Sequence, residues 1–131
     1  MIIKTLTSAV LLSAVATAAS AGVPTYTVDG LANCLETSTG TSPGFVRVDL
    51  APGTYKASVV RSTLANNPGY PDVIDSNVAL IVDFYTQGTF AQGKPLKFTV
   101  SNPNGSPVWV YYVDSFCADN AGSTVVKFMP Q

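Results

Sequence analysis

Polar and hydrophobic residues alternate in several short segments after residue 21, and this alternation indicates strands that bury one face. In residues 45–50, for example, Arg47 and Asp49 each stand between two apolar residues. Similar segments occur at residues 23–28, 54–59 and 94–101. The positions predicted to face the core are Tyr26 and Val28, then Val46, Val48 and Leu50, then Tyr55, Ala57 and Val59, then Leu96, Phe98 and Val100.

Turn-forming residues between these segments predict which strands pair. Pro and Gly at residues 51–53 favour a tight turn, because Pro fixes φ and Gly tolerates a positive φ. We therefore expect residues 45–61 to form a hairpin. The Asn-Gly pair at 104–105 is a strong hairpin signal between residues 94–101 and the apolar run at 108–113.

The other segments differ from this pattern in polarity and length. Residues 77–86 are apolar on both faces, which predicts one central strand, and residues 87–93 then form a turn. Residues 62–76 are rich in Asn, Pro, Gly and Asp, and predict a long loop of the kind that often carries function. The polar residues at 114–122 have the composition of a hairpin loop before a last strand at 123–129.

About seven or eight short strands and no credible helix after residue 21 predict an all-β fold. We expect a two-sheet antiparallel, jelly-roll-like β-sandwich that forms a single domain over residues 22–131.

Residues 1–21 have the organisation of a secretory signal peptide. Lys4 precedes an apolar centre, and Ala19-Ser20-Ala21 is a small-x-small cleavage site. A retained N-terminal anchor is the alternative, but the apolar part is short and rich in Ala, Ser and Thr. We therefore expect a secreted or periplasmic protein with no membrane span in its mature form.

Charge and composition argue against several classes of function. Without Lys4, six basic residues face the eight acidic ones, and they form no basic patch for a nucleic acid. The chain has no His, which removes imidazole bases, His-containing triads and His zinc sites. The acidic residues are dispersed, and no glycine-rich phosphate loop precedes a helix. We therefore expect no enzyme.

Cys34 and Cys117 are the two cysteines of the chain. An exported protein meets an oxidising compartment, so we expect a disulfide between them, with two buried free thiols as the alternative. The disulfide would join the loop at 114–122 to the N-terminal part of the domain.

The loop at 114–122 also carries the residues best suited to a metal ion. Asp114, Asp119 and Asn120 offer carboxylate and amide oxygens, and Gly122 allows the chain to turn. Calcium takes about six to eight such oxygen ligands, including main-chain carbonyls. The loop therefore predicts a calcium site, and the alternative is a polar turn without a ligand.

The same residues carry a resemblance to a known group of proteins. The pattern D-S-F-x-x-D-N-x-G-S at residues 114–123, between two apolar strands, resembles the C-terminal end of small secreted bacterial jelly-roll domains. Domains of this kind are found ahead of exosortase sorting tails, and the pattern is distantly similar to calcium-dependent galactose-binding lectins. The resemblance implies calcium at Asp114, Asp119 and Asn120, with sugar hydroxyls completing its shell. The spacing here is tighter than in those lectins.

Aromatic side chains are candidates for stacking on a sugar ring. Tyr70 lies in the long polar loop with Asn67 and Asp72, and we assign these three residues as candidate ligand contacts. Asp75 of that loop is a further oxygen donor if the two loops meet. Trp109, Tyr111 and Tyr85 lie in predicted strands, where aromatic residues usually fill the core.

These observations predict a secreted, non-enzymatic, lectin-like or adhesive domain that binds calcium, with carbohydrate or a cell-surface glycan as its partner. The alternative is a structural or assembly protein of the cell envelope or extracellular matrix with no small ligand.

Overall fold

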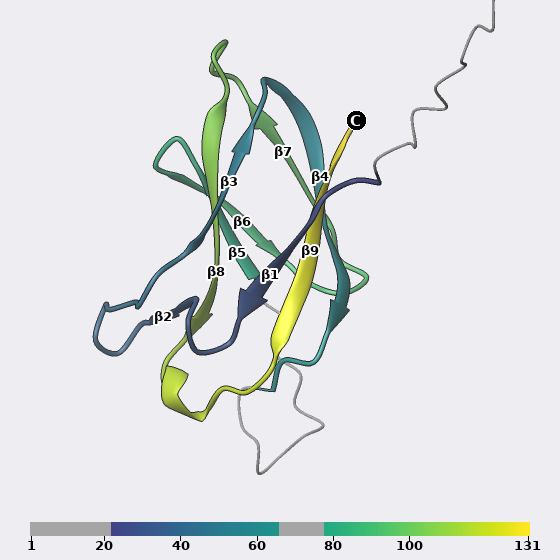
Figure 1. The fold of residues 1–131 in the computed structure, drawn as a ribbon. Coiled ribbons are helices and arrows are strands. Elements are labelled where there is room, and N and C mark those ends of the chain that lie inside the picture. The colour runs from purple at the N-terminus through teal and green to yellow at the C-terminus, as the bar shows by residue number, and fades with distance from the viewer. Residues whose placement is uncertain (1–21, 66–77) are drawn as a thin grey trace, which may run out of the picture.

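Two β-sheets pack face to face in the computed structural model, which describes residues 22–65 and 78–131 (Figure 1). One sheet has the strand order β1-β9-β4-β7 and is antiparallel throughout. Its strands are β1 (Thr25–Asp29), β9 (Ser123–Pro130), β4 (Gly53–Ser62) and β7 (Leu96–Val100).

The other sheet has the order β2-β8-β5-β6, with β3 also paired to β8. Its strands are β2 (Cys34–Glu36), β8 (Ser106–Asp114), β5 (Val78–Val82), β6 (Tyr85–Phe90) and β3 (Val46–Leu50). Among the strands that the structure describes, only β2 pairs in parallel, along the last three residues of β8. A single turn of 3-10 helix, η1 (Cys117–Asp119), lies between β8 and β9. The predicted all-β, two-sheet sandwich is confirmed.

The core lies between the sheets and contains the positions that the alternation predicts. Val28, Leu80 and Val126 are completely buried, whereas Arg47 and Lys97 on the alternate positions are exposed. Aromatic rings continue the core toward one end, where Phe98 packs edge-on against Phe128 with ring centroids 5.8 Å apart. All eleven predicted inward positions are buried or pack against this core: Tyr26, Val28, Val46, Val48, Leu50, Tyr55, Ala57, Val59, Leu96, Phe98 and Val100.

The hairpins predicted from turn residues are wrong. β3 pairs with β8, and β4 pairs with β7 and β9, so the turn at 51–52 carries the chain from one sheet to the other. The connections from β7 to β8 and from β8 to β9 also cross between the sheets. Alternation shows which residues face the core, but both sheets share that core. It therefore cannot decide which sheet a strand joins.

The central strand predicted at 77–86 is also wrong in its length. β5 is central, between β8 and β6, but it ends at Val82. Asp83 and Phe84 form a two-residue turn with φ of 49° and 68°. β6 then occupies part of the segment predicted as a turn. Such turns usually contain Gly or Asn, and the Asp-Phe pair does not give that signal. The short strand β2 had no recognisable alternation either.

Candidate functional site

Loops from three parts of the chain meet at the end of the sandwich that contains η1, shown at the bottom of Figure 1. They are the turn between β1 and β2, the loop at 114–122 and the segment after β4. Gly30 N donates to Gly122 O over 3.0 Å, and Ala121 N donates to Ala65 O over 2.7 Å. We call this part of the molecule the η1 end. Main-chain hydrogen bonds therefore fix the candidate loop against neighbours that are remote in sequence.

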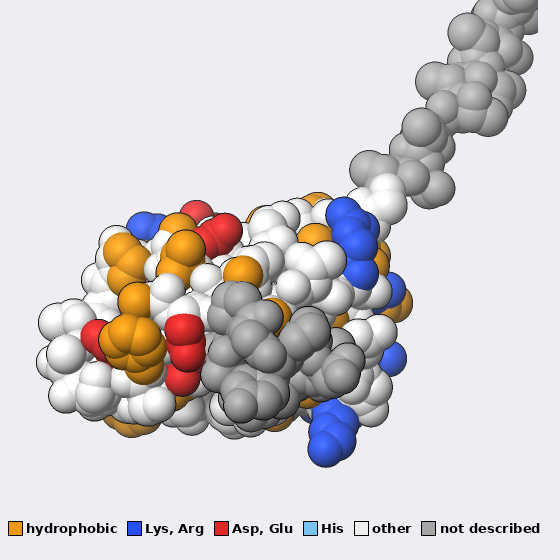
Figure 2. All heavy atoms as spheres, turned by 90° about the horizontal axis from the view of Figure 1, so that it is seen from below, with side chains coloured by type: hydrophobic (Ala, Val, Ile, Leu, Met, Phe, Trp, Pro, Cys, Tyr) orange, Lys and Arg blue, Asp and Glu red, His pale blue; other side chains and the backbone are white. Residues whose placement is uncertain are grey.

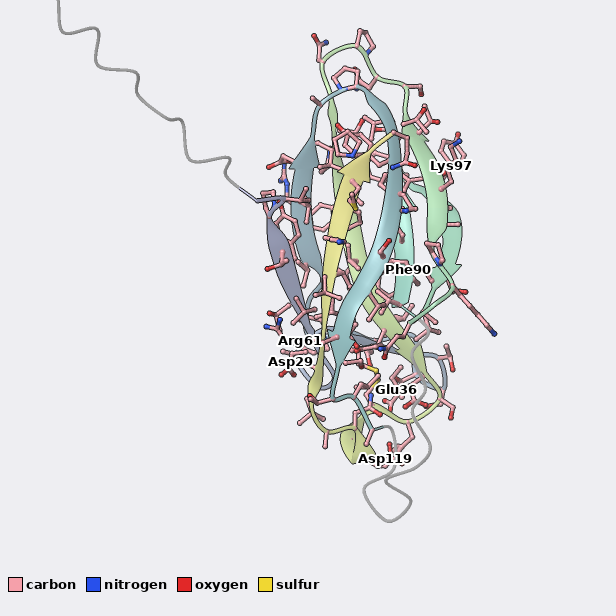
Figure 3. The ribbon with its side chains drawn as sticks, turned by 90° about the vertical axis from the view of Figure 1, so that its right-hand side faces the viewer. Asp29, Glu36, Arg61, Phe90, Lys97 and Asp119 are labelled. Atoms are coloured by element: carbon pink, nitrogen blue, oxygen red, sulfur yellow. A yellow bond between two sulfur atoms is a disulfide. The ribbon has the colours of Figure 1, made fainter. Side chains whose placement is uncertain are left out.

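The surface of the η1 end is partly apolar. Leu31 and Phe116 expose 51% and 56% of their surface. Figure 2 looks onto this end and shows hydrophobic side chains with acidic ones beside them. Figure 3 shows that Asp29, Glu36 and Asp119 lie at this same end of the sandwich. An apolar surface beside carboxylates offers both stacking and polar contacts to a ligand.

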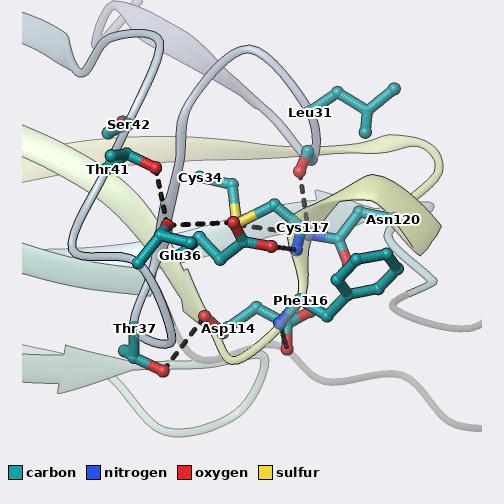
Figure 4. Close-up of a disulfide and its surroundings, with 12 residues drawn as sticks. Leu31, Cys34, Glu36, Thr37, Thr41, Ser42, Asp114, Phe116, Cys117 and Asn120 are labelled. Carbon is teal, nitrogen blue, oxygen red and sulfur yellow. Dashed lines mark hydrogen bonds between the residues drawn. A yellow bond between two sulfur atoms is a disulfide. The ribbon is translucent and has the colours of Figure 1, made fainter.

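The disulfide between Cys34 and Cys117 is present, with an S–S distance of 2.05 Å and a Cα–Cα distance of 6.0 Å. Cys34 is buried at the start of β2, and Cys117 begins η1 (Figure 4). The expected bridge is thereby confirmed, and it joins the candidate loop to β2. Because β2 pairs with the end of β8, the bridge closes a compact unit around the loop.

Asp114 ends β8 and uses its side chain within the loop. Its Oδ1 accepts a hydrogen bond of 3.3 Å from the main-chain N–H of Phe116. Its carbonyl oxygen accepts a hydrogen bond of 2.8 Å from the N–H of Thr37. This carboxylate therefore helps to shape the turn that leads into η1 (Figure 4).

The side chains of Asp119 and Asn120 have different surroundings from that of Asp114. Asn120 is 5% exposed, and its Nδ2 donates to Gly30 O over 2.9 Å and lies 3.4 Å from Cys34 Sγ. Among the described residues, neither Asp119 Oδ1 nor Asn120 Oδ1 has a hydrogen-bond partner, although both atoms are buried. Buried polar atoms in folded proteins nearly always have a protein, water or ion partner. These two oxygens are therefore the atoms of the loop best suited to a cation.

Glu36 belongs to the η1 end but was not predicted from the sequence. Its Oε1 accepts a hydrogen bond of 3.2 Å from the N–H of Cys117, and its Oε2 accepts one of 3.0 Å from Thr39 Oγ1. The sequence contains a signal for this position, since Glu36 follows Cys34 by two residues and a disulfide between Cys34 and Cys117 is expected. A predicted disulfide brings the neighbours of both cysteines together.

The predicted calcium ligands thus have separate environments. Asp114 Oδ1 binds a main-chain N–H, whereas Asp119 and Asn120 each retain a buried oxygen without a partner in the described part of the chain. Within residues 22–65 and 78–131, no group of three or more His, Cys, Asp or Glu side chains is placed to hold a metal. A cation here would depend on Asp119, Asn120 and main-chain carbonyls, which are the hard oxygen donors that calcium takes.

The other candidate contacts are only partly described. Asn67, Tyr70, Asp72 and Asp75 lie outside the described residues. The strand aromatics fall into two groups. Arg47 covers the ring of Trp109 at 5.5 Å, and Phe45 stacks on Tyr111 with ring centroids 4.3 Å apart. Tyr85, by contrast, is 74% exposed. The covered rings of Trp109 and Tyr111 are poorly placed to stack on a sugar.

No protein-family model, curated protein or solved structure matches this chain. In the part that the structure describes, no helix has the length and apolar character needed to cross a membrane.

Proposed function

We propose that this protein is a secreted or periplasmic, non-enzymatic binding domain of a lectin-like or adhesive kind, and that the η1 end binds calcium together with a glycan. The observation that carries this proposal is the pair of buried oxygens on successive residues, Asp119 Oδ1 and Asn120 Oδ1, which lack partners among the described residues.

The charge around the loop supports a cation. No Lys or Arg occurs between Lys97 and Lys127 in the sequence, so the loop has no basic neighbour along the chain. Asp119 would contribute a carboxylate oxygen and Asn120 an amide oxygen, while the Asn120 Nδ2 stays bound to Gly30. A bound calcium ion would offset the cost of leaving these oxygens buried without a partner.

The surface supports a carbohydrate. A sugar ring presents apolar C–H faces and polar hydroxyl edges, and the η1 end has the exposed Phe116 next to Asp114, whose Oδ1 accepts a hydrogen bond from its main-chain N–H (Figure 4). The disulfide and the main-chain bonds hold this surface in place, so little ordering entropy opposes binding. The disulfide also fits an oxidising compartment outside the cytosol.

Calcium titration of thermal unfolding tests the metal part of the proposal. Binding to the folded state raises stability by RT ln(1 + [Ca]/Kd), about 2.7 kcal/mol at a hundredfold excess over Kd. Asp119→Asn keeps the shape but removes the charge, and should abolish this gain. Asp49→Asn is the matched control, because Asp49 is an exposed acid paired with Arg47. A wild-type melting temperature that does not change in millimolar calcium would refute the metal site.

A glycan array with and without calcium tests the second part. We expect binding that requires calcium and that is lost in Phe116→Ser. Val60→Ser is the control, since Val60 is also an exposed apolar residue, on β4. Glycan binding that persists with a chelator would show that the carbohydrate surface does not require the metal.

A structural or assembly role is the second candidate function. The observation that favours it is Phe84, which is 98% exposed at the turn between β5 and β6. An aromatic side chain fully in water gains most from contact with another macromolecule.

A further inference from the structure

The turn between β5 and β6 presents two aromatic side chains to solvent. Phe84 is 98% exposed, and Tyr85 beside it is 74% exposed. The base of the turn is fixed, because Ser106 Oγ donates a hydrogen bond of 2.6 Å to Asp83 Oδ1. We call Phe84 and Tyr85 the knob. It is an apolar projection on a short, anchored turn.

The knob has an unfavourable backbone. Phe84 has a φ of 68°, in the left-handed region where a bulky side chain is strained and Gly is preferred. The ring of Phe84 is not buried within the described fold, so no packing offsets this strain. Strained residues of this kind concentrate at sites of binding or catalysis. Folding alone therefore does not account for Phe at this position.

An aromatic cleft opens elsewhere on the same chain. It has a volume of about 440 Å³ and is lined by residues of β1, β4 and β9 from one sheet and of β3 from the other. The aromatic residues Tyr26, Tyr55 and Phe128 line it together with Leu50 and Val23, and Asp49 is the one charged residue among the described residues that line it. A cavity of this size and character can accept an aromatic side chain.

We propose that the knob of one copy of this protein enters the aromatic cleft of another copy. Phe84 is almost fully exposed, so it does not occupy the cleft of its own chain. The cleft offers rings and aliphatic groups, which are the partners that a Phe side chain prefers. Without Lys4 the chain has six basic and eight acidic residues, so two copies repel each other only weakly. Because knob and cleft are different surfaces, the contact is heterologous.

The contact is small. Each aromatic side chain buries about 150–250 Å², so the knob alone is well below the area of a standard interface. Association should therefore be weak and depend on concentration. Where many copies are held close together, as in a layer or fibre outside the cell, such contacts add up.

Sedimentation velocity of the purified protein at rising concentration tests the proposal. The wild-type sedimentation coefficient should increase with concentration, while that of Phe84→Gly stays at the monomer value. Phe84→Gly should also melt at a higher temperature than the wild type, because Gly relieves the strained turn. Loss of association together with higher stability cannot be caused by misfolding. Val60→Ser, at an exposed apolar position on β4, is the control and should associate like the wild type.

Mixing two variants shows whether knob and cleft contact each other. Val23→Asp places a charge at the cleft, where Val23 is 40% exposed, and leaves the knob intact. Val23→Asp and Phe84→Gly should each be monomeric alone, but should associate when mixed, since one supplies the knob and the other the cleft. A monomeric wild type at every concentration, unchanged association of Phe84→Gly, or a mixture that stays monomeric would each refute the proposal.

Discussion

The side-chain amide of Asn120 donates a hydrogen bond of 2.9 Å to the carbonyl oxygen of Gly30, which lies 90 residues earlier in the chain. The same nitrogen lies 3.4 Å from Cys34 Sγ, and Gly30 N donates in turn to Gly122 O. One buried amide thus joins the last loop, the first turn and the disulfide. The η1 end is therefore a cross-linked unit rather than a set of independent loops.

We expect Asn120→Ala to lower the free energy of unfolding by about 1–3 kcal/mol, because it removes a buried hydrogen bond and leaves the Gly30 carbonyl without this donor. Urea denaturation measures the change. Asn104→Ala is the matched control on an exposed loop, and should stay within about 0.5 kcal/mol of the wild type. Equal effects of the two substitutions would show that Asn120 does not hold the η1 end together.

Gly122 is required by its backbone and by its surroundings. Its φ is 78°, and a Cβ at this position would lie 2.2 Å from Thr63 O, a main-chain atom that cannot rotate away. Gly122→Ala should therefore cost more than the roughly 1–3 kcal/mol of left-handed strain alone. Gly40 separates the two effects, since its φ is 68° but nothing lies within 4 Å of its Cβ position. A loss in Gly40→Ala as large as in Gly122→Ala would mean that the contact with Thr63 contributes nothing.

The disulfide should be a major source of stability. Its cysteines are 83 residues apart, and the chain-entropy model gives about 4–5 kcal/mol for a loop of this length. We expect the Cys34→Ala, Cys117→Ala double variant to unfold at much lower urea concentration than the oxidised wild type. Thiol labelling of the unfolded, unreduced protein should find no free thiol. Two labelled cysteines would show that the bridge does not form in solution.

The sequence predicted the buried faces well because they follow from local chemistry. Val48, Ala57 and Phe98 each alternate with polar neighbours, and a period of two leaves one choice of inward side. Strand pairing is not local. A short Pro-Gly turn separates β3 from β4, yet the two strands belong to different sheets. They pack against the same core from opposite sides, so the alternation of the residues is the same in either sheet.

Only the part of the candidate site that lies in the loop at 114–122 could be predicted from the sequence. Asp119 and Asn120 stand out by residue type, but the groups around them come from distant segments. Glu36 and Gly30 reach the loop through the disulfide and the pairing of β2 with β8, and neither carries a motif of its own. Phe84 was expected on the face of a strand, because nothing in an Asp-Phe pair indicates two left-handed residues.

Tyr111 gives a prediction that depends on pH. Its ring stacks on Phe45 and is 5% exposed, and burial raises the pKa of its hydroxyl above the ordinary value of 10.0. In the unfolded chain the hydroxyl ionises at the ordinary pKa, whereas the folded protein holds its proton to a higher pH. The stabilisation from Tyr111 is therefore complete below pH 10 and is lost as the pH rises through the folded pKa.

Urea denaturation between pH 8 and pH 11 should show this loss. The free energy of unfolding of the wild type should fall more steeply above pH 10 than that of Tyr111→Phe, which keeps the stacked ring but has no hydroxyl to ionise. Tyr85→Phe, which removes a hydroxyl from a side chain that is 74% exposed, is the control for the substitution itself. If Tyr111→Phe also follows the wild type at high pH, then the burial of this ring does not favour the neutral hydroxyl.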